Sequence, residues 1–152
     1  MNNVTSSSRT DFNIMLIGVA TSALFFIAAI RPSILENNMI FTLQLICAIP
    51  LLLSSTIASR RTADTKEPAV FDAYATYLSV LGYALIINAV GILVAIFANK
   101  WAAVIFFILN IAAPLVYSYL RVTVDKYSVS VRVLQDGFFI LTIIVFGLAV
   151  VL

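Results

Sequence analysis

The sequence contains no histidine, a single cysteine (Cys47) and very few charged residues. The lack of histidine excludes Ser-His-Asp and Cys-His catalytic groups, histidine-dependent metal sites and a histidine ligand for haem. A single cysteine excludes a disulfide within the chain. Charged residues make up only 11% of the chain, and the formal net charge is +2. We therefore expect no cofactor, no metal and no nucleic-acid partner.

Apolar residues are correspondingly abundant. They make up 62% of the 152 residues, and the mean hydropathy is +1.09. Soluble domains are about 45–50% apolar and roughly 25% charged. A chain of this length leaves much of its surface exposed when it folds, so it cannot hide this much apolar area from water. The composition predicts an all-α integral membrane protein in contact with a lipid bilayer.

The apolar runs predict a bundle of about five transmembrane helices, with four as the alternative. A spanning helix needs about 20 mainly apolar residues. The predicted spans, within a single membrane domain over 1–152, are 12–30, 39–58, 73–98, 101–120 and 134–152. The last span is short unless Gln135 and Asp136 enter the headgroups; otherwise the C-terminal segment is a half-inserted hairpin.

Basic residues predict the orientation of the bundle. With five spans, seven of the nine basic residues lie on the side of the N-terminus. The positive-inside rule then places the N-terminus in the cytoplasm and the C-terminus outside. The seven residues are Arg9, Arg60, Arg61, Lys66, Arg121, Lys126 and Arg132, whereas the other side has Arg31 and Lys100.

Two connections between predicted spans are long enough for a prediction of their own structure. Residues 59–72 carry charges of both signs around Pro68, which predicts a solvated cytoplasmic loop. Residues 122–136 fit both a helical stripe and an alternating strand pattern. A lone strand at a membrane surface would leave backbone groups unpaired, so we predict an interfacial helix that leads into the fifth span.

Three amides lie inside predicted spans: Gln44, Asn88 and Asn110. An unpaired polar group in hydrocarbon costs several kcal/mol, so we expect these side chains to face other helices. They either line a polar path or form inter-helix contacts, each hydrogen bond contributing about 0.6–2 kcal/mol. Asn110 has a third option, because its side chain could cap the carbonyl that Pro114 leaves free.

Prolines and small residues point to local helix geometry. Pro50 and Pro114 each remove a helical hydrogen bond and predict a kink. Small residues spaced by four favour close helix approach, within one chain or between chains. The candidate packing positions are Gly18, Ser22, Gly82 and Gly91, together with the pair Ala75 and Ser79.

No acidic or basic side chain lies well inside a predicted span, which disfavours a proton relay through the membrane. An enzyme acting on lipid would have to use a few interfacial residues without a recognisable spacing, so we predict that the chain is not an enzyme. These residues are Asp72, Asp136, Lys126 and Arg132.

The preferred function is a structural or accessory membrane component that packs with itself, as a homo-oligomer, or with a partner membrane subunit. The alternative is an oligomeric channel or facilitator for a small ion or solute, with Gln44, Asn88 and Asn110 near a shared path. Because the N-terminus resembles no transit peptide, with Arg9 as its only basic residue, the expected location is a prokaryotic cytoplasmic membrane.

Overall fold

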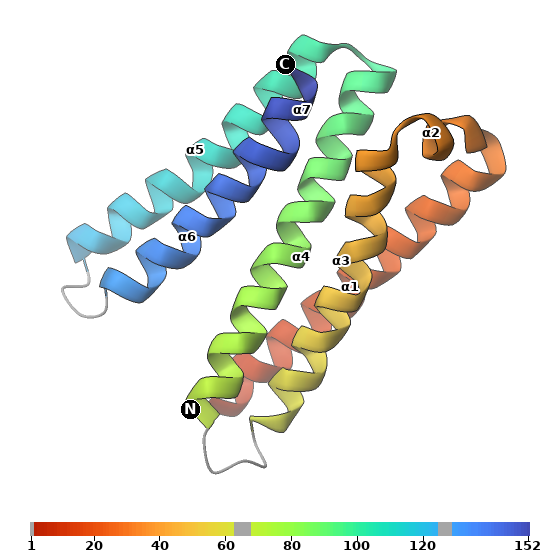
Figure 1. The fold of residues 1–152 in the computed structure, drawn as a ribbon. Coiled ribbons are helices and arrows are strands. Elements are labelled where there is room, and N and C mark those ends of the chain that lie inside the picture. Colours follow the sequence, from red (N-terminus) through yellow and green to blue (C-terminus); the bar gives the residue numbers. More distant parts are fainter. Residues whose placement is uncertain (1, 63–67, 125–128) are drawn as a thin grey trace. The chain divides into compact units, whose positions relative to one another are not determined.

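The chain folds into helices joined by short connections (Figure 1). The computed structural model describes residues 2–62, 68–124 and 129–152. No strand occurs in these ranges. The helices are α1 (Asn2–Ile30), α2 (Pro32–Asn37), α3 (Met39–Arg61), α4 (Pro68–Phe97), α5 (Lys100–Val124) and α6 (Val129–Ile143), followed by a π-helical turn, η1 (Ile144–Leu148), and a final α-helical turn, α7 (Ala149–Val151).

Four helices are long and apolar enough to cross a membrane. Their spanning segments are Ser8–Ile30, Met39–Arg61, Pro68–Phe97 and Lys100–Tyr119. The last apolar stretch, Asp136–Val151, is a shorter helix. The all-helical class is therefore confirmed in the described part of the chain, which has four helices of sufficient length and hydropathy to span a membrane. The fifth crossing, the orientation and the single membrane domain over 1–152 stay predictions.

The helices extend further than the predicted spans. Helix α3 continues to Arg61 and α4 begins at Pro68, so both enter the segment 59–72 that was expected to be a loop. Hydropathy marks only the part of a helix that lies in hydrocarbon, whereas the backbone ladder can continue into the headgroups. Proline is well suited to the first turn of a helix, because its missing N–H would have no partner there.

The short helix α2 is not predicted by the apolar pattern. It begins at Pro32 and directs the chain from α1 into α3. Polar side chains bond its backbone: Thr42 Oγ1 donates to the carbonyl of Leu35 at 2.7 Å, and Asn38 Nδ2 donates to the carbonyl of Ile34 at 3.1 Å. These bonds satisfy carbonyls at the C-terminal end of α2.

The segment 122–136 is helical wherever the structure describes it. Helix α5 continues to Val124, and α6 starts at Val129; residues 125–128 lie outside the described residues. The prediction of a helix over a strand is confirmed for these positions. Its place at a membrane interface stays a prediction.

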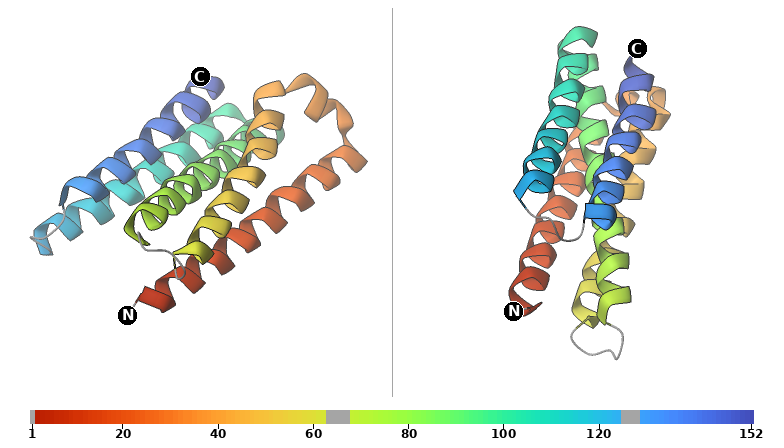
Figure 2. Two further views of the ribbon diagram at one scale, coloured as in Figure 1. Left: turned by 60° about the horizontal axis from the view of Figure 1, so that its bottom comes forward. Right: turned by 90° about the vertical axis from the view of Figure 1, so that its left-hand side faces the viewer.

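The chain divides into two compact units, residues 1–86 and 87–152, and the boundary lies inside α4. In unit 1, α1 and α3 pack as antiparallel neighbours and the first part of α4 joins them. In unit 2, α5 packs against α6, η1 and α7, and Figure 2 shows α5 and α6 running in opposite directions.

Close helix approach in each unit depends on glycine. In unit 1, a Cβ atom at Gly82 would lie 2.7 Å from Cγ of Leu52, which is fully buried. In unit 2, the fully buried ring of Phe107 lies against both Gly91 of α4 and Gly147 of η1. A Cβ atom at either glycine would overlap this ring, so glycine at these two positions lets the helices meet.

Candidate functional site

The three predicted amides have different environments. Gln44 on α3 and Asn88 on α4 are buried, whereas Asn110 on α5 is only partly buried. Gln44 belongs to unit 1, and Asn88 and Asn110 belong to unit 2. The two buried amides face protein, as expected. The shared polar path through all three residues stays a prediction.

Asn110 bonds its own helix. Its Nδ2 donates to the carbonyl of Phe106 at 2.9 Å, one turn earlier in α5. The suggested cap on the carbonyl freed by Pro114 is therefore wrong, because the amide points toward the preceding turn. Side chains of helical residues lean toward the N-terminus of the helix, which explains why the Asn110 amide bonds the preceding turn.

Both Pro50 and Pro114 lie inside continuous helices, and the predicted kinks stay predictions.

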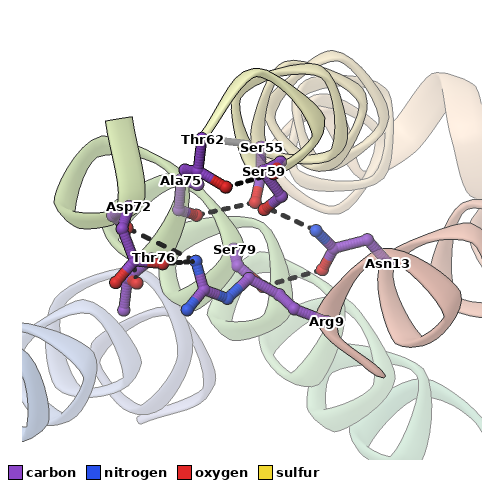
Figure 3. Close-up of polar contacts among 9 residues, drawn as sticks. All are labelled: Arg9, Asn13, Ser55, Ser59, Thr62, Asp72, Ala75, Thr76 and Ser79. Atoms are coloured by element: carbon purple, nitrogen blue, oxygen red, sulfur yellow. Dashed lines mark hydrogen bonds and ion pairs between the residues drawn. The ribbon is translucent and has the colours of Figure 1, made fainter. Parts of the chain in front are cut away.

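A set of buried and part-buried polar contacts lies in unit 1 and centres on Asn13 (Figure 3). Asn13 Nδ2 donates to Ser55 Oγ at 2.9 Å, and Ser79 Oγ donates to Asn13 Oδ1 at 2.7 Å. Ser55 Oγ donates in turn to the carbonyl of Ala75 at 2.6 Å. We call Asn13, Ser55, Ser79 and the Ala75 carbonyl the Asn13 cluster. It joins α1, α3 and α4.

The bonds in the Asn13 cluster run in one direction and end on a backbone acceptor. Each serine hydroxyl donates once, and both ends of the Asn13 amide are used. Asn13 and Ser55 are fully buried. A buried polar group without a partner would cost about 1–3 kcal/mol, so these bonds stabilise the packing of α1, α3 and α4 in unit 1. The side chains of the cluster are asparagine and serine, so the cluster carries no charge.

One ion pair lies close to the Asn13 cluster. Arg9 Nη1 is 2.9 Å from Asp72 Oδ1, and the two side chains are 21% and 57% exposed. Arg9 also donates to the Asp72 carbonyl at 3.3 Å, which Thr76 Oγ1 contacts at 2.7 Å. Exposed ion pairs contribute about 0–1 kcal/mol. The pair therefore connects α1 and α4 but contributes little to stability.

Unit 2 has a second buried polar contact, between Asn88 and the last helix. Asn88 Nδ2 donates to the carbonyl of Thr142 at 3.2 Å, and Thr142 Oγ1 donates to the carbonyl of Phe138 at 2.8 Å. Asn88 is fully buried. Its Oδ1 lies against Gly147 and accepts no hydrogen bond from the described residues.

The interfacial residues considered for lipid chemistry do not form a described site. Asp72 pairs with Arg9 in unit 1, and Asp136 accepts a hydrogen bond from Ser118 in unit 2. Lys126 and the side chain of Arg132 lie outside the described residues. In the described part of the chain, no group of three or more acidic or cysteine side chains is placed to hold a metal ion. Cys47 is a free, exposed thiol.

The predicted packing positions fall into two groups. Gly82 and Gly91 lie at close helix contacts, and the pair Ala75 and Ser79 lies in the Asn13 cluster. In contrast, Gly18 has no atom within 4 Å of its would-be Cβ, and Ser22 is exposed. Spacing by four finds small residues on one helix face, but it does not tell which face meets another helix of the same chain.

Sequence reasoning missed Asn13, Ser55 and Gly147. Asn13 lies at the second position of the predicted first span, at a depth where headgroups and water can bond an amide, so its position alone does not predict burial. An amide and two serines in three different spans were the available signal.

Comparison with family models, curated proteins and solved structures finds no match to this chain.

Proposed function

We propose that this protein is a structural or accessory membrane component that packs with itself or with a partner membrane subunit. The observation that supports this proposal most is the Asn13 cluster. Its polar side chains bond one another and a backbone carbonyl of the same unit, so they hold three helices together.

The uncovered apolar surface supports the same proposal. In the most apolar 18-residue window of Lys100–Tyr119 in α5, only 11% of the residues are buried, against 44% in the corresponding window of Pro68–Phe97 in α4. Helix α1 adds large apolar side chains that are exposed, among them Phe25 and Phe26, which are 74% and 66% exposed. We place the protein in the cytoplasmic membrane of a prokaryote, where these faces contact lipid or a neighbouring subunit.

Native mass spectrometry after gentle extraction tests the proposal. We expect a defined complex, either a closed homo-oligomer or an assembly with another polypeptide. The mass of the complex identifies the number of copies, and a co-purifying subunit identifies the process that the protein serves. A monomer that carries only lipid in every extraction condition would contradict an accessory role.

The second candidate is an oligomeric channel or facilitator, which one observation favours. Asn88 Oδ1 is a buried acceptor in a helix that is long and apolar enough to span a membrane, and it receives no hydrogen bond from the described residues. In liposomes, Asn88→Leu or Gln44→Leu should then change solute flux while the complex keeps its mass. Unchanged flux in both variants, or no flux from the purified protein, would leave the accessory role as the function.

A further inference from the structure

The last helix of unit 2 contains a π-helical turn, η1, between two α-helical parts. The N–H of Ala149 reaches the carbonyl of Ile144, five residues earlier, where an α-helix would use the fourth. Such turns are rare and occur mostly as single bulges, frequently at functional positions. One extra residue in a helix turns everything beyond it by about 100° relative to a regular α-helix.

A side chain from a neighbouring helix contacts the backbone just before this turn. Asn88 Nδ2 on α4 donates to the carbonyl of Thr142, two residues before η1. Irregularities in helices commonly arise where a side chain inserts into the backbone hydrogen-bond ladder. Since Asn88 is fully buried, no water from outside can replace its amide at this carbonyl.

Gly147 makes the π register compatible with the packing around it. The residue lies against Asn88 Oδ1 and the Phe107 ring, and a Cβ atom there would be 2.5 Å from Phe107 Cε1. Removing the extra residue from the turn would bring a sequence neighbour, Phe146 or Leu148, toward this position. Either side chain is far larger than the space that glycine occupies, so Phe107 would have to move.

We propose that Asn88 selects the π register of the last helix, and that loss of its hydrogen bond to Thr142 returns this helix to a regular α register. The contribution of Asn88 to the π register is the one hydrogen bond to Thr142, since its Oδ1 accepts none from the described residues. In the α register, Phe107 yields its place and the residues beyond η1 turn by about 100°.

The change of register alters the surface that the end of the chain presents. Val150 is now exposed and Val151 is half-buried. In the α register, the Val150 side chain points in the direction that Val151 has now. The Val151 side chain then points in the direction of the exposed Leu152. This inference concerns unit 2 alone and does not depend on the proposed function.

Spin labelling in phosphatidylcholine vesicles tests the two registers. Cys47→Ala provides a chain without cysteine, and single cysteines at Leu141, Val150 and Val151 then carry a nitroxide. Oxygen accessibility reports which labels face lipid. In the parent chain, the label at position 150 should be more accessible than the label at 151. In Asn88→Leu the order should invert, while the label at 141, before the turn, keeps its value.

Two further variants make the result decisive. Asn88→Ala removes the amide without adding volume, so it serves where Asn88→Leu fails to fold, and it should invert the same order. Asn110→Leu is the matched control, because the Asn110 amide bonds its own helix; it should leave the order unchanged. An unchanged order in both Asn88 variants, or an inverted order in Asn110→Leu as well, would overturn the proposal.

Discussion

An asparagine in a membrane-spanning helix is stable only where its amide finds partners, and Asn13 and Asn88 meet this need in different ways. Asn13 donates to one serine and accepts from another, so both ends of its amide are bonded. Asn88 uses only its donor end among the described residues. Both side chains are fully buried, which makes Asn13 a fixed contact and Asn88 a position with unused hydrogen-bonding capacity.

The stability of unit 1 should depend strongly on Asn13. We expect Asn13→Ala to lower the free energy of unfolding by about 1–3 kcal/mol, because Ser55 and Ser79 lose a buried partner. A double-mutant cycle with Ser79→Ala should give a coupling of about 0.6 kcal/mol, the usual value between membrane helices. Denaturant titration in mixed micelles measures both quantities.

The exposed Ser22 of the same helix provides the control for this cycle. Ser22→Ala should change the free energy of unfolding by no more than about 0.5 kcal/mol. A coupling of zero between Asn13 and Ser79 would mean that their hydrogen bond does not form in the membrane protein.

At the scale of helices, the sequence predicts the long apolar helices but not the short elements that depend on contacts between helices. The apolar runs identify α1, α3, α4 and α5. A chain this short cannot bury several uninterrupted apolar stretches in a water-soluble core, so each is expected to be a spanning helix. Helix α2 and the turn η1 have no such signal. Both depend on contacts with residues distant in the sequence or in a later helix, such as Thr42 for α2 and Asn88 for η1.

The same limit applies to the candidate site. Burial of Gln44 and Asn88 is predictable, since a lone amide in a span must face protein. Which partner each amide meets is not predictable, because rotation of one helix by a single residue would bring a different side chain to the contact. The role of Gly147 follows only from the position of Phe107 on another helix.

Glycine contacts should set how closely α4 and α5 approach in unit 2. Gly91→Ala places a methyl group in the space of the Phe107 ring, and overpacking of this kind costs about 1–3 kcal/mol. The thermal transition of the purified protein should fall accordingly. Gly18→Ala is the matched control, since nothing lies within 4 Å of its added methyl group.

For Gly18→Ala, the higher helix propensity of alanine should leave stability unchanged or raise it by up to about 1 kcal/mol. Equal losses of stability in both variants would show that glycine acts through the backbone in each case and that the fit against Phe107 is not the cause.

For the molecule as a whole, charge is the only sequence feature that predicts orientation. Seven of the nine basic residues fall on the side of the N-terminus with four crossings as well as with five, because all of them precede the last apolar segment. Reporter fusions that are active on one side of the membrane should therefore place residue 1 in the cytoplasm. If the last segment also crosses, they should place residue 152 outside.

A fusion after Asn99, in the short connection between α4 and α5, serves as the internal standard and should report the outer side. Cytoplasmic signals from both ends of the chain would establish four crossings, and Asp136–Val151 would then be a half-inserted segment.

The boundary between the two units, which lies between Ile86 and Ile87 inside α4, has a practical consequence for dissecting the protein. Multidomain proteins are usually cut at a linker, but here no linker separates the units. A fragment that stopped at this boundary would end in mid-helix, with four carbonyls unpaired at membrane depth. Separately expressed halves should instead meet at Asn99, so that α4 stays whole in the first fragment and unit 2 is rebuilt only when the second fragment joins it.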